Sequence, residues 1–245
     1  MKKRNRIGFF ILFVLIVAGL VSIALRPKEP SYQGKRISTW QDDFAARNGG
    51  TKYYEAIREL GTNGLPYAVR NLALNDSKLR NKYRELRLKS PRFMQIFLPT
   101  PKPLLQVVDG ANVFFHIGSP AIPYAIVLLK HESSTVRQSA AWGLCSLRRQ
   151  SPAANQAIPA LIDALSDNEQ QVRFYAALAF TEMGEDASNA VPALTKILAN
   201  TGQTNSLFYL RAAVARALGK IGPPAINAIP ELKKALKETD PNFRG

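Results

Sequence analysis

The side chains of this sequence that could act on a charged partner are gathered in one short segment, residues 76–105. Between residues 76 and 103, eight Lys and Arg residues stand against only Asp76 and Glu85. A cationic surface of this kind can bind anionic lipid headgroups, each Lys or Arg contributing about 1 kcal/mol, or nucleic acid. The residues that we expect to carry such binding are Arg80, Arg84, Arg87 and Lys89.

The same segment also has a purely structural interpretation. Leu79, Tyr83 and Leu86 recur at helical spacing. The segment can therefore be a variant repeat whose apolar side packs on the rest of the protein while its basic side chains are solvated. Pro91 should end the helix, and residues 99–103 should form a stiff extended stretch. Both interpretations remain open at the level of the sequence.

Patterns for catalysis and metal binding are absent from the sequence. His116 and His131 are the only histidines, and neither has a second ligand residue at metal-binding spacing. The sequence contains no G-x-S-x-G, no phosphate-binding glycine loop and no H-E-x-x-H. Cys145 is the single cysteine, which excludes an internal disulfide and, among alanines, indicates a buried thiol. We predict a protein without catalytic activity, cofactor or metal.

Two markers recur with the same period and indicate internal repeats. A proline preceded by Ile or Val recurs at intervals of 36, 33 and 38 residues, and an arginine preceded by Val or Leu recurs at intervals of 36 and 38 residues. Two independent markers with one period are strong evidence of a repeat. The prolines are Pro123, Pro159, Pro192 and Pro230, and the arginines are Arg137, Arg173 and Arg211.

The residue types within the repeats favour helices. Proline is accommodated in the first turn of a helix, where its missing N–H would have no partner. Gly184 and Gly222 stand where a glycine would end a helix in a left-handed conformation. Alanine pairs, such as Ala140 with Ala141, would let neighbouring helices approach closely. No stretch alternates with a period of two, so the sequence predicts an all-α fold without strands.

These repeats resemble the HEAT family, including its HEAT-like repeats of the phycobilisome-lyase type. The resemblance implies an α-solenoid of about five helix pairs, with first helices on the convex face and second helices on the concave face. In that family an Asp often meets the Arg of the following Val-Arg step, a pattern that Asp167 and Arg173 fit. Glu132 with Arg137 is a looser fit, and Asn200 before Arg211 departs from it.

The sequence of the amino end predicts that the chain is targeted to a membrane. Residues 1–6 are cationic and residues 7–25 are uncharged and apolar, long enough to span a bilayer as one helix. We expect a retained anchor with a cytoplasmic amino terminus and an extracytoplasmic repeat domain, periplasmic in a Gram-negative cell. A cleaved signal peptide with secretion of the mature protein is the alternative.

The expected organisation follows from these features. Outside the membrane flank and the basic segment the charge is nearly balanced, so we expect no nucleic-acid partner despite the net charge of +15. The expected segments are 1–6 as cationic flank, 7–25 as anchor or signal, 26–36 as linker, 37–47 as capping helix, 48–75 as the first repeat, 76–105 as a basic and Pro-rich insertion, 106–238 as HEAT repeats and 239–245 as tail.

The function predicted from these elements is a membrane-tethered, non-catalytic scaffold that binds an unidentified partner protein along its groove. The alternatives are a lyase-type enzyme or chromophore-handling protein, suggested by the resemblance, and a binder of anionic lipid or nucleic acid through the insertion. The groove residues that we predict, from outward polar positions of the second helices, are Asn71, Lys130, Asp163, Lys196 and Lys233.

Overall fold

The structure is a computed structural model, and it describes residues 29–46, 50–200 and 208–238. The predicted cationic flank, the anchor at 7–25 and the tail at 239–245 lie outside the described residues. Within the described residues no single helix is long and apolar enough to cross a bilayer. Two consecutive stretches, Val107–Ile117 and Ser119–Leu128, meet that criterion only together, and they are bent by 120°.

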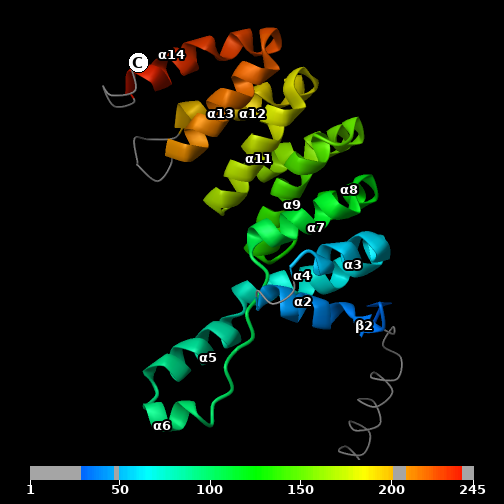
Figure 1. The fold of residues 1–245 in the computed structure, drawn as a ribbon. Helices are drawn as coiled ribbons and strands as arrows, with labels where there is room; N and C mark the ends of the chain where they lie inside the picture. The colour runs from blue at the N-terminus through cyan, green and yellow to red at the C-terminus, as the bar shows by residue number, and fades with distance from the viewer. Residues whose placement is uncertain (1–28, 47–49, 201–207, 239–245) are drawn as a thin grey trace, which may run out of the picture.

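The described chain forms a stack of helix pairs (Figure 1). In the last four pairs the second helix begins one residue before one of the recurring prolines, as the sequence predicts, and in the first pair it begins one residue before Pro66. The stack agrees with the expected all-α solenoid of about five pairs. In chain order the pairs are α3 (Lys52–Leu60) with α4 (Leu65–Ala73), α7 (Val107–Ile117) with α8 (Ile122–Leu128), α9 (Ser134–Arg148) with α10 (Ile158–Ala164), α11 (Gln170–Met183) with α12 (Val191–Asn200), and α13 (Phe208–Ile221) with α14 (Ile229–Glu238).

Short 3₁₀ helices connect many of these elements, and glycines end several first helices. Gly184 and Gly222 have φ of 60° and 74°, which confirms the predicted left-handed caps. The turn after α9 has no glycine, and Ser151 there accepts a hydrogen bond from the Ala153 N–H. The 3₁₀ helices are η1 (Gly61–Gly64), η2 (Leu74–Asp76), η3 (Ser119–Ala121), η4 (Pro152–Ala157), η5 (Gly184–Ala190) and η7 (Pro223–Ala228).

The core lies between the stacked first helices α7, α9, α11 and α13. Ala140 and Ala141 of α9 and Ala176 and Ala177 of α11 are fully buried, so small side chains do bring these helices together. The approach is close at Gly143, where an added Cβ would lie 2.6 Å from the Phe114 ring. Close packing of this kind leaves little internal space for a ligand.

The amino end of the described chain contains a small β-hairpin, which contradicts the expected absence of strands. β1 (Ser31–Tyr32) pairs antiparallel with β2 (Lys35–Arg36), in a region predicted to be a linker. Two residues per strand are too few to produce a visible alternation. The hairpin leads into α2 (Ile37–Ala45), where the Trp40 indole N–H donates to the Tyr32 carbonyl over 3.1 Å.

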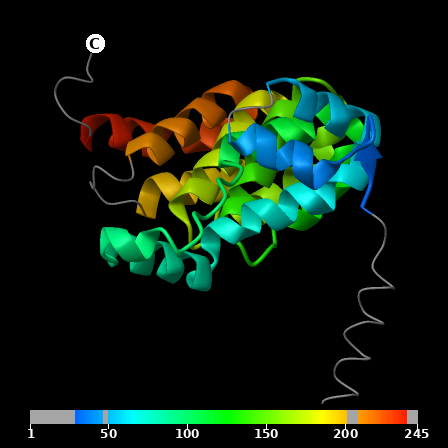
Figure 2. The same cartoon turned by 60° about the horizontal axis from the view of Figure 1, so that its bottom comes forward.

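The insertion departs most clearly from the stack. α5 (Lys78–Lys89) and α6 (Arg92–Gln95) stand beside the helix pairs and not among them (Figure 1 and Figure 2). Pro91 separates the two helices, as predicted, and residues 99–106 are neither helix nor strand, which fits the extended stretch predicted over 99–103. The predicted packing of the apolar side on the solenoid is wrong, because Leu79 and Leu86 are 82% and 60% exposed. Hydrogen bonds to the returning chain, described below, hold the insertion together.

Candidate functional site

The basic helix α5 holds the irregular return of the chain, residues 98–105, hereafter the return stretch. The Tyr83 hydroxyl donates to the Pro99 carbonyl over 2.7 Å. Arg87 donates from Nε to the Leu98 carbonyl and from Nη2 to the Thr100 hydroxyl, both over 3.2 Å. The Arg80 guanidinium donates to the Lys102 carbonyl. Two of the four predicted binding residues therefore have a structural role that the sequence did not indicate.

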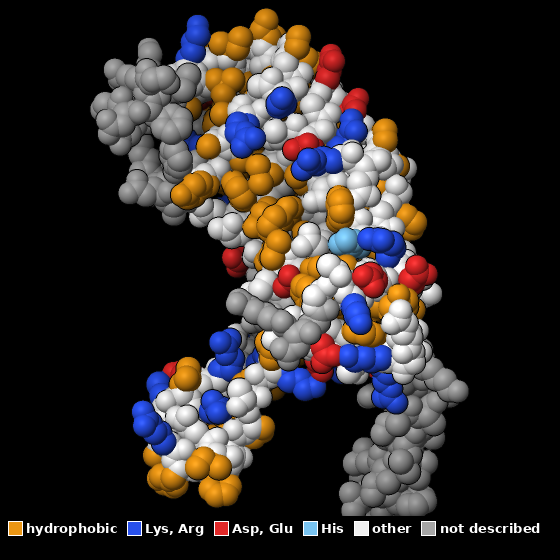
Figure 3. Space-filling view, viewed as in Figure 1, with side chains coloured by type: hydrophobic (Ala, Val, Ile, Leu, Met, Phe, Trp, Pro, Cys, Tyr) orange, Lys and Arg blue, Asp and Glu red, His pale blue; other side chains and the backbone are white. Residues whose placement is uncertain are grey.

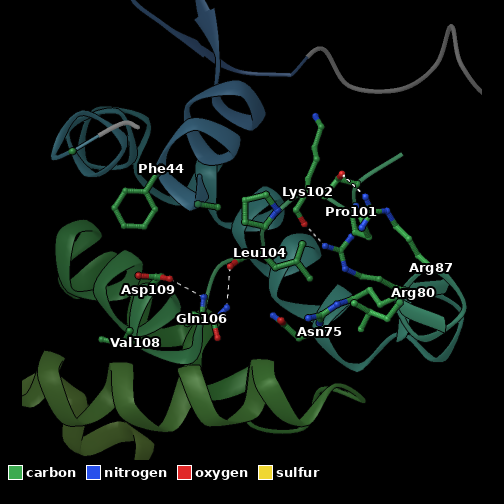
Figure 4. A pocket seen from close by; sticks show the side chains of 16 residues that line it. Phe44, Asn75, Arg80, Arg87, Pro101, Lys102, Leu104, Gln106, Val108 and Asp109 are labelled. Atoms are coloured by element: carbon green, nitrogen blue, oxygen red, sulfur yellow. Dashed lines mark hydrogen bonds between the residues drawn. The ribbon is translucent and has the colours of Figure 1, made fainter. Parts of the chain in front are cut away.

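A cleft of about 920 Å³ lies between α5, the return stretch and the start of α7. Figure 4 shows Lys102 and Leu104 of the return stretch between Phe44 and Asp109 on one side and Arg80 and Arg87 on the other. The remaining lining residues include Ala45, Gly50, Asn75, Arg84, Leu88, Thr100, Pro101, Pro103, Gln106 and Val108.

The wall formed by α5 is positively charged, and some of its guanidinium N–H groups have no hydrogen-bond partner in the described chain. Burial, assisted by the neighbouring Arg84 charge, lowers the pKa of Arg80 from its ordinary value. The Arg80 Nε is buried and has no hydrogen-bond partner in the described chain. Within the same residues no hydrogen bond or ion pair engages Arg84, whose side chain is exposed. Arginine donors of this kind suit carboxylate or phosphate acceptors.

The opposite wall is apolar with one fixed carboxylate. Phe44 packs on Tyr53 and Tyr54, with ring centroids 5.2 and 4.9 Å away. Asp109 accepts a hydrogen bond from the Gln106 N–H over 2.7 Å, which caps α7. Because this cap occupies one of its oxygens, Asp109 is a structural carboxylate at the edge of the cleft.

Lys102 is held at the rim by an ion pair. Its Nζ lies 2.6 Å from Asp42 of α2, so the return stretch is tied to the amino-terminal helix. The hydrogen bond and the charge of Asp42 raise the pKa of Lys102. The pair is solvent-exposed, which limits its contribution to stability.

The cleft offers no catalytic constellation among the described residues. Its lining contains no histidine, cysteine or serine, and no group of three or more His, Cys, Asp and Glu residues in the described chain could hold a metal ion. His116 instead stacks on Tyr54 with ring centroids 4.6 Å apart, and burial together with the Arg58 charge lowers its pKa. The cleft is thus equipped for binding an anionic ligand.

Of the predicted groove residues, the structure brings Lys130 and Asp163 together at one cavity of about 440 Å³. The Asn71 amide oxygen accepts from the Leu105 N–H over 2.9 Å, so Asn71 anchors the end of the insertion and is not an outward groove residue. Lys130 and Asp163 form an exposed ion pair of 3.5 Å between neighbouring pairs. Lys196 and Lys233 are exposed on α12 and α14. Of the remaining predicted residues, Lys89 pairs with Glu85 on α5 over 2.5 Å.

A polar chain joins successive repeat turns near the insertion. Arg137 binds the Asp167 carboxylate through Nε and Nη2 over 2.7 and 2.9 Å. Asp76, one turn earlier, accepts from the Ser133 hydroxyl and from the Thr135 N–H and hydroxyl. Arg173 meets Asp167 as the resemblance implies, but it donates to the Asp167 main-chain carbonyl over 2.6 Å, while the carboxylate is bound by Arg137. The conformation of each turn is thus tied to that of its neighbour.

For other residues of the site, the sequence contained little indication that they line a cleft. Phe44, Leu104 and Val108 line the cleft from three separate segments. Each looks like an ordinary apolar residue in its own segment. Cys145, expected to be a buried thiol, is half-buried, and burial raises its pKa to about 11.

Comparison with known families supports the repeat architecture. Residues 122–205 match the family model of HEAT repeats, and residues 210–238 match that of the PBS lyase HEAT-like repeat. No curated protein was found to match the chain. The matched residues begin at α8 and run to the end of α14, so the cleft and the insertion lie outside both matches.

Proposed function

We propose that this protein is a non-catalytic scaffold whose cleft binds an extended acidic segment of a partner protein. HEAT repeats suggest a scaffold for protein interaction, and stacked helix pairs display long surfaces suited to extended partners. The observation that carries the proposal is the basic wall of the cleft. There the Arg84 side chain is exposed and engages no described residue, so its guanidinium can bind a carboxylate.

The apolar wall explains why the ligand should be a peptide segment. Phe44, Leu104 and Val108 can receive apolar side chains, while the α5 guanidiniums receive carboxylates. A small inorganic anion would leave the apolar wall unused. A polypeptide with alternating acidic and apolar residues uses both walls.

The proposal includes the location of the protein in the cell. Residues 7–25, which follow the cationic residues 1–6, would tether the repeat domain to the extracytoplasmic face of a membrane. The partner is then a protein of the same compartment. Mass measurement of the mature amino terminus distinguishes a retained anchor from a cleaved signal.

The binding proposal is tested with a labelled acidic peptide and the full chain in detergent. Fluorescence anisotropy should detect binding of a fluorescein-labelled peptide of alternating Glu and Leu. Arg84→Glu should weaken it by about tenfold or more, equivalent to about 1.4 kcal/mol. The matched control is Arg216→Glu, an exposed arginine on α13 outside the cleft. Equal effects of both substitutions would contradict a specific role of the cleft.

One comparison favours a second candidate function. The match of residues 210–238 to the PBS lyase HEAT-like repeat leaves a chromophore-handling or lyase-type role open. Such a role requires the purified protein to bind a bilin pigment and change its visible absorbance. A spectrum that is the sum of the separate spectra would rule this candidate out.

A further inference from the structure

The inserted hairpin, residues 78–98, carries an apolar surface that no described part of the chain covers. Figure 3 shows hydrophobic side chains gathered at the end of the hairpin that points away from the stack. Ile96 and Phe97 are 82% and 83% exposed. The other large exposed apolar residues of the hairpin are Leu79, Leu86, Leu88, Phe93 and Met94.

Exposure on this scale is unusual for a folded protein in water. Single exposed apolar residues are ordinary, but a contiguous group at the tip of a projecting element marks an interaction surface. The clasp of the return stretch by Tyr83 and Arg87 keeps this tip ordered. The apolar tip is therefore presented in a fixed conformation.

The charge around the tip identifies its partner. Residues 78–98 contain seven Lys and Arg and one acidic residue, Glu85. Lys82, Arg84 and Arg92 are exposed, and the single acidic residue is paired with Lys89. The basic side chains lie above the apolar tip. This order matches a lipid bilayer, in which anionic headgroups lie above the acyl chains.

We infer that the tip of the hairpin inserts into an anionic phospholipid bilayer. Phe93, Ile96 and Phe97 enter the boundary between headgroups and acyl chains, and the belt of Lys82, Lys89 and Arg92 binds the lipid phosphates. The inference is independent of the proposed peptide site, since these six residues do not line the cleft. It adds to the expected anchor a second contact that fixes the orientation of the solenoid on the membrane.

The test measures depth and not mere attachment, because residues 7–25 are themselves expected to hold the chain at the membrane. The full-length Phe97→Trp variant is reconstituted into phosphatidylglycerol-rich vesicles with or without bromine on the acyl chains. Bromine should quench about half or more of the emission that the new tryptophan adds, since the tip reaches the acyl boundary. The native Trp40 and Trp142, present in every variant, provide the baseline.

Two controls make the result decisive. Ile226→Trp places the probe at an exposed site of the last helix pair and should show no quenching. Replacing Lys82, Lys89 and Arg92 with Ser in the Phe97→Trp background should abolish most of the quenching, while the return stretch keeps its Arg80 and Arg87 contacts. Absence of quenching at position 97 would overturn the inference and assign the tip to a protein partner. Equal quenching in uncharged phosphatidylcholine vesicles, or after the Ser substitutions, would overturn the role of anionic lipid.

Discussion

Arg137 and Asp167 form the strongest-looking ion pair of the described repeats. The pair is bidentate, and its side chains are only 15% and 12% exposed. The resemblance to the HEAT family had implied Arg173 as the partner of Asp167. The geometry differs because Arg173 reaches the carbonyls of Asp167 and Asn168, just as Arg137 reaches those of His131 and Glu132.

Removal of this carboxylate should destabilise the protein. We expect Asp167→Ala to lower the free energy of unfolding by about 1–3 kcal/mol, because a partly buried guanidinium loses its two hydrogen bonds to the carboxylate. Urea denaturation followed by circular dichroism measures the change. Glu132→Ala is the control, since Arg137 uses only the backbone carbonyl of Glu132. A loss of the same size in the control would contradict the role given to the pair.

Asp76 and Asp167 also predict how stability depends on pH. Burial alone would raise the pKa of both, but hydrogen bonds outweigh it and lower each pKa: Ser133, Ser134 and Thr135 donate to Asp76, and Arg137 and the Glu169 N–H donate to Asp167. Their stabilisation is complete above the unfolded value of about 3.9 and is lost as the pH falls through the folded pKa.

The check is a comparison of unfolding at pH 7 with unfolding at successively lower pH. The wild-type protein should lose more free energy of unfolding on acidification than the Asp76→Asn, Asp167→Asn double variant, whose amides do not titrate. Parallel pH profiles for the two proteins would refute the assignment.

Among the elements, the contact of α7 with α9 is the most sensitive to side-chain size. Gly143 lies against the Phe114 side chain, and Gly110 lies against Leu72 and Ser139. Alanine has the higher helix propensity by about 1 kcal/mol. At Gly143 this gain is outweighed, because the Phe114 Cβ would be 2.9 Å from the added Cβ.

The two opposite effects can be measured side by side. Gly143→Ala should destabilise the protein by about 1–3 kcal/mol through overpacking. Gly219→Ala, in α13 with nothing within 4 Å of the added Cβ, should instead stabilise it by about 0.5–1 kcal/mol. Thermal or urea unfolding of both variants gives the signs directly, and a stabilised Gly143→Ala would show that the two helices can move apart freely.

For the inserted hairpin, the sequence predicted the helices but not which of their sides is covered. Helical spacing predicted α5 and Pro91 predicted its end, because both follow from local backbone preferences. The spacing of Leu79 and Leu86 says that they share one side of a helix. Whether any surface covers that side depends on the three-dimensional path of the chain.

At the scale of the whole molecule, the period of the prolines and arginines predicted the repeats, and the resemblance to the HEAT family implied that they stack. Each repeat buries its apolar side only against its neighbours, so one period defines the architecture. The cleft was not predictable in the same way. It is formed by Phe44, by the return stretch and by α7, and the hydrogen bonds that shape it end on backbone carbonyls, which have no residue signature.

The scaffold is tested most directly by photo-crosslinking from within the cleft, in cells that produce the protein. A photoreactive amino acid replaces Val108, which lines the cleft, or Val127, which is 72% exposed on α8 outside it. We expect a discrete adduct only from position 108. Mass spectrometry should identify an acidic segment of the partner in this adduct, and Arg84→Glu should abolish the adduct. Equal labelling from both positions, or an adduct unaffected by Arg84→Glu, would contradict the account.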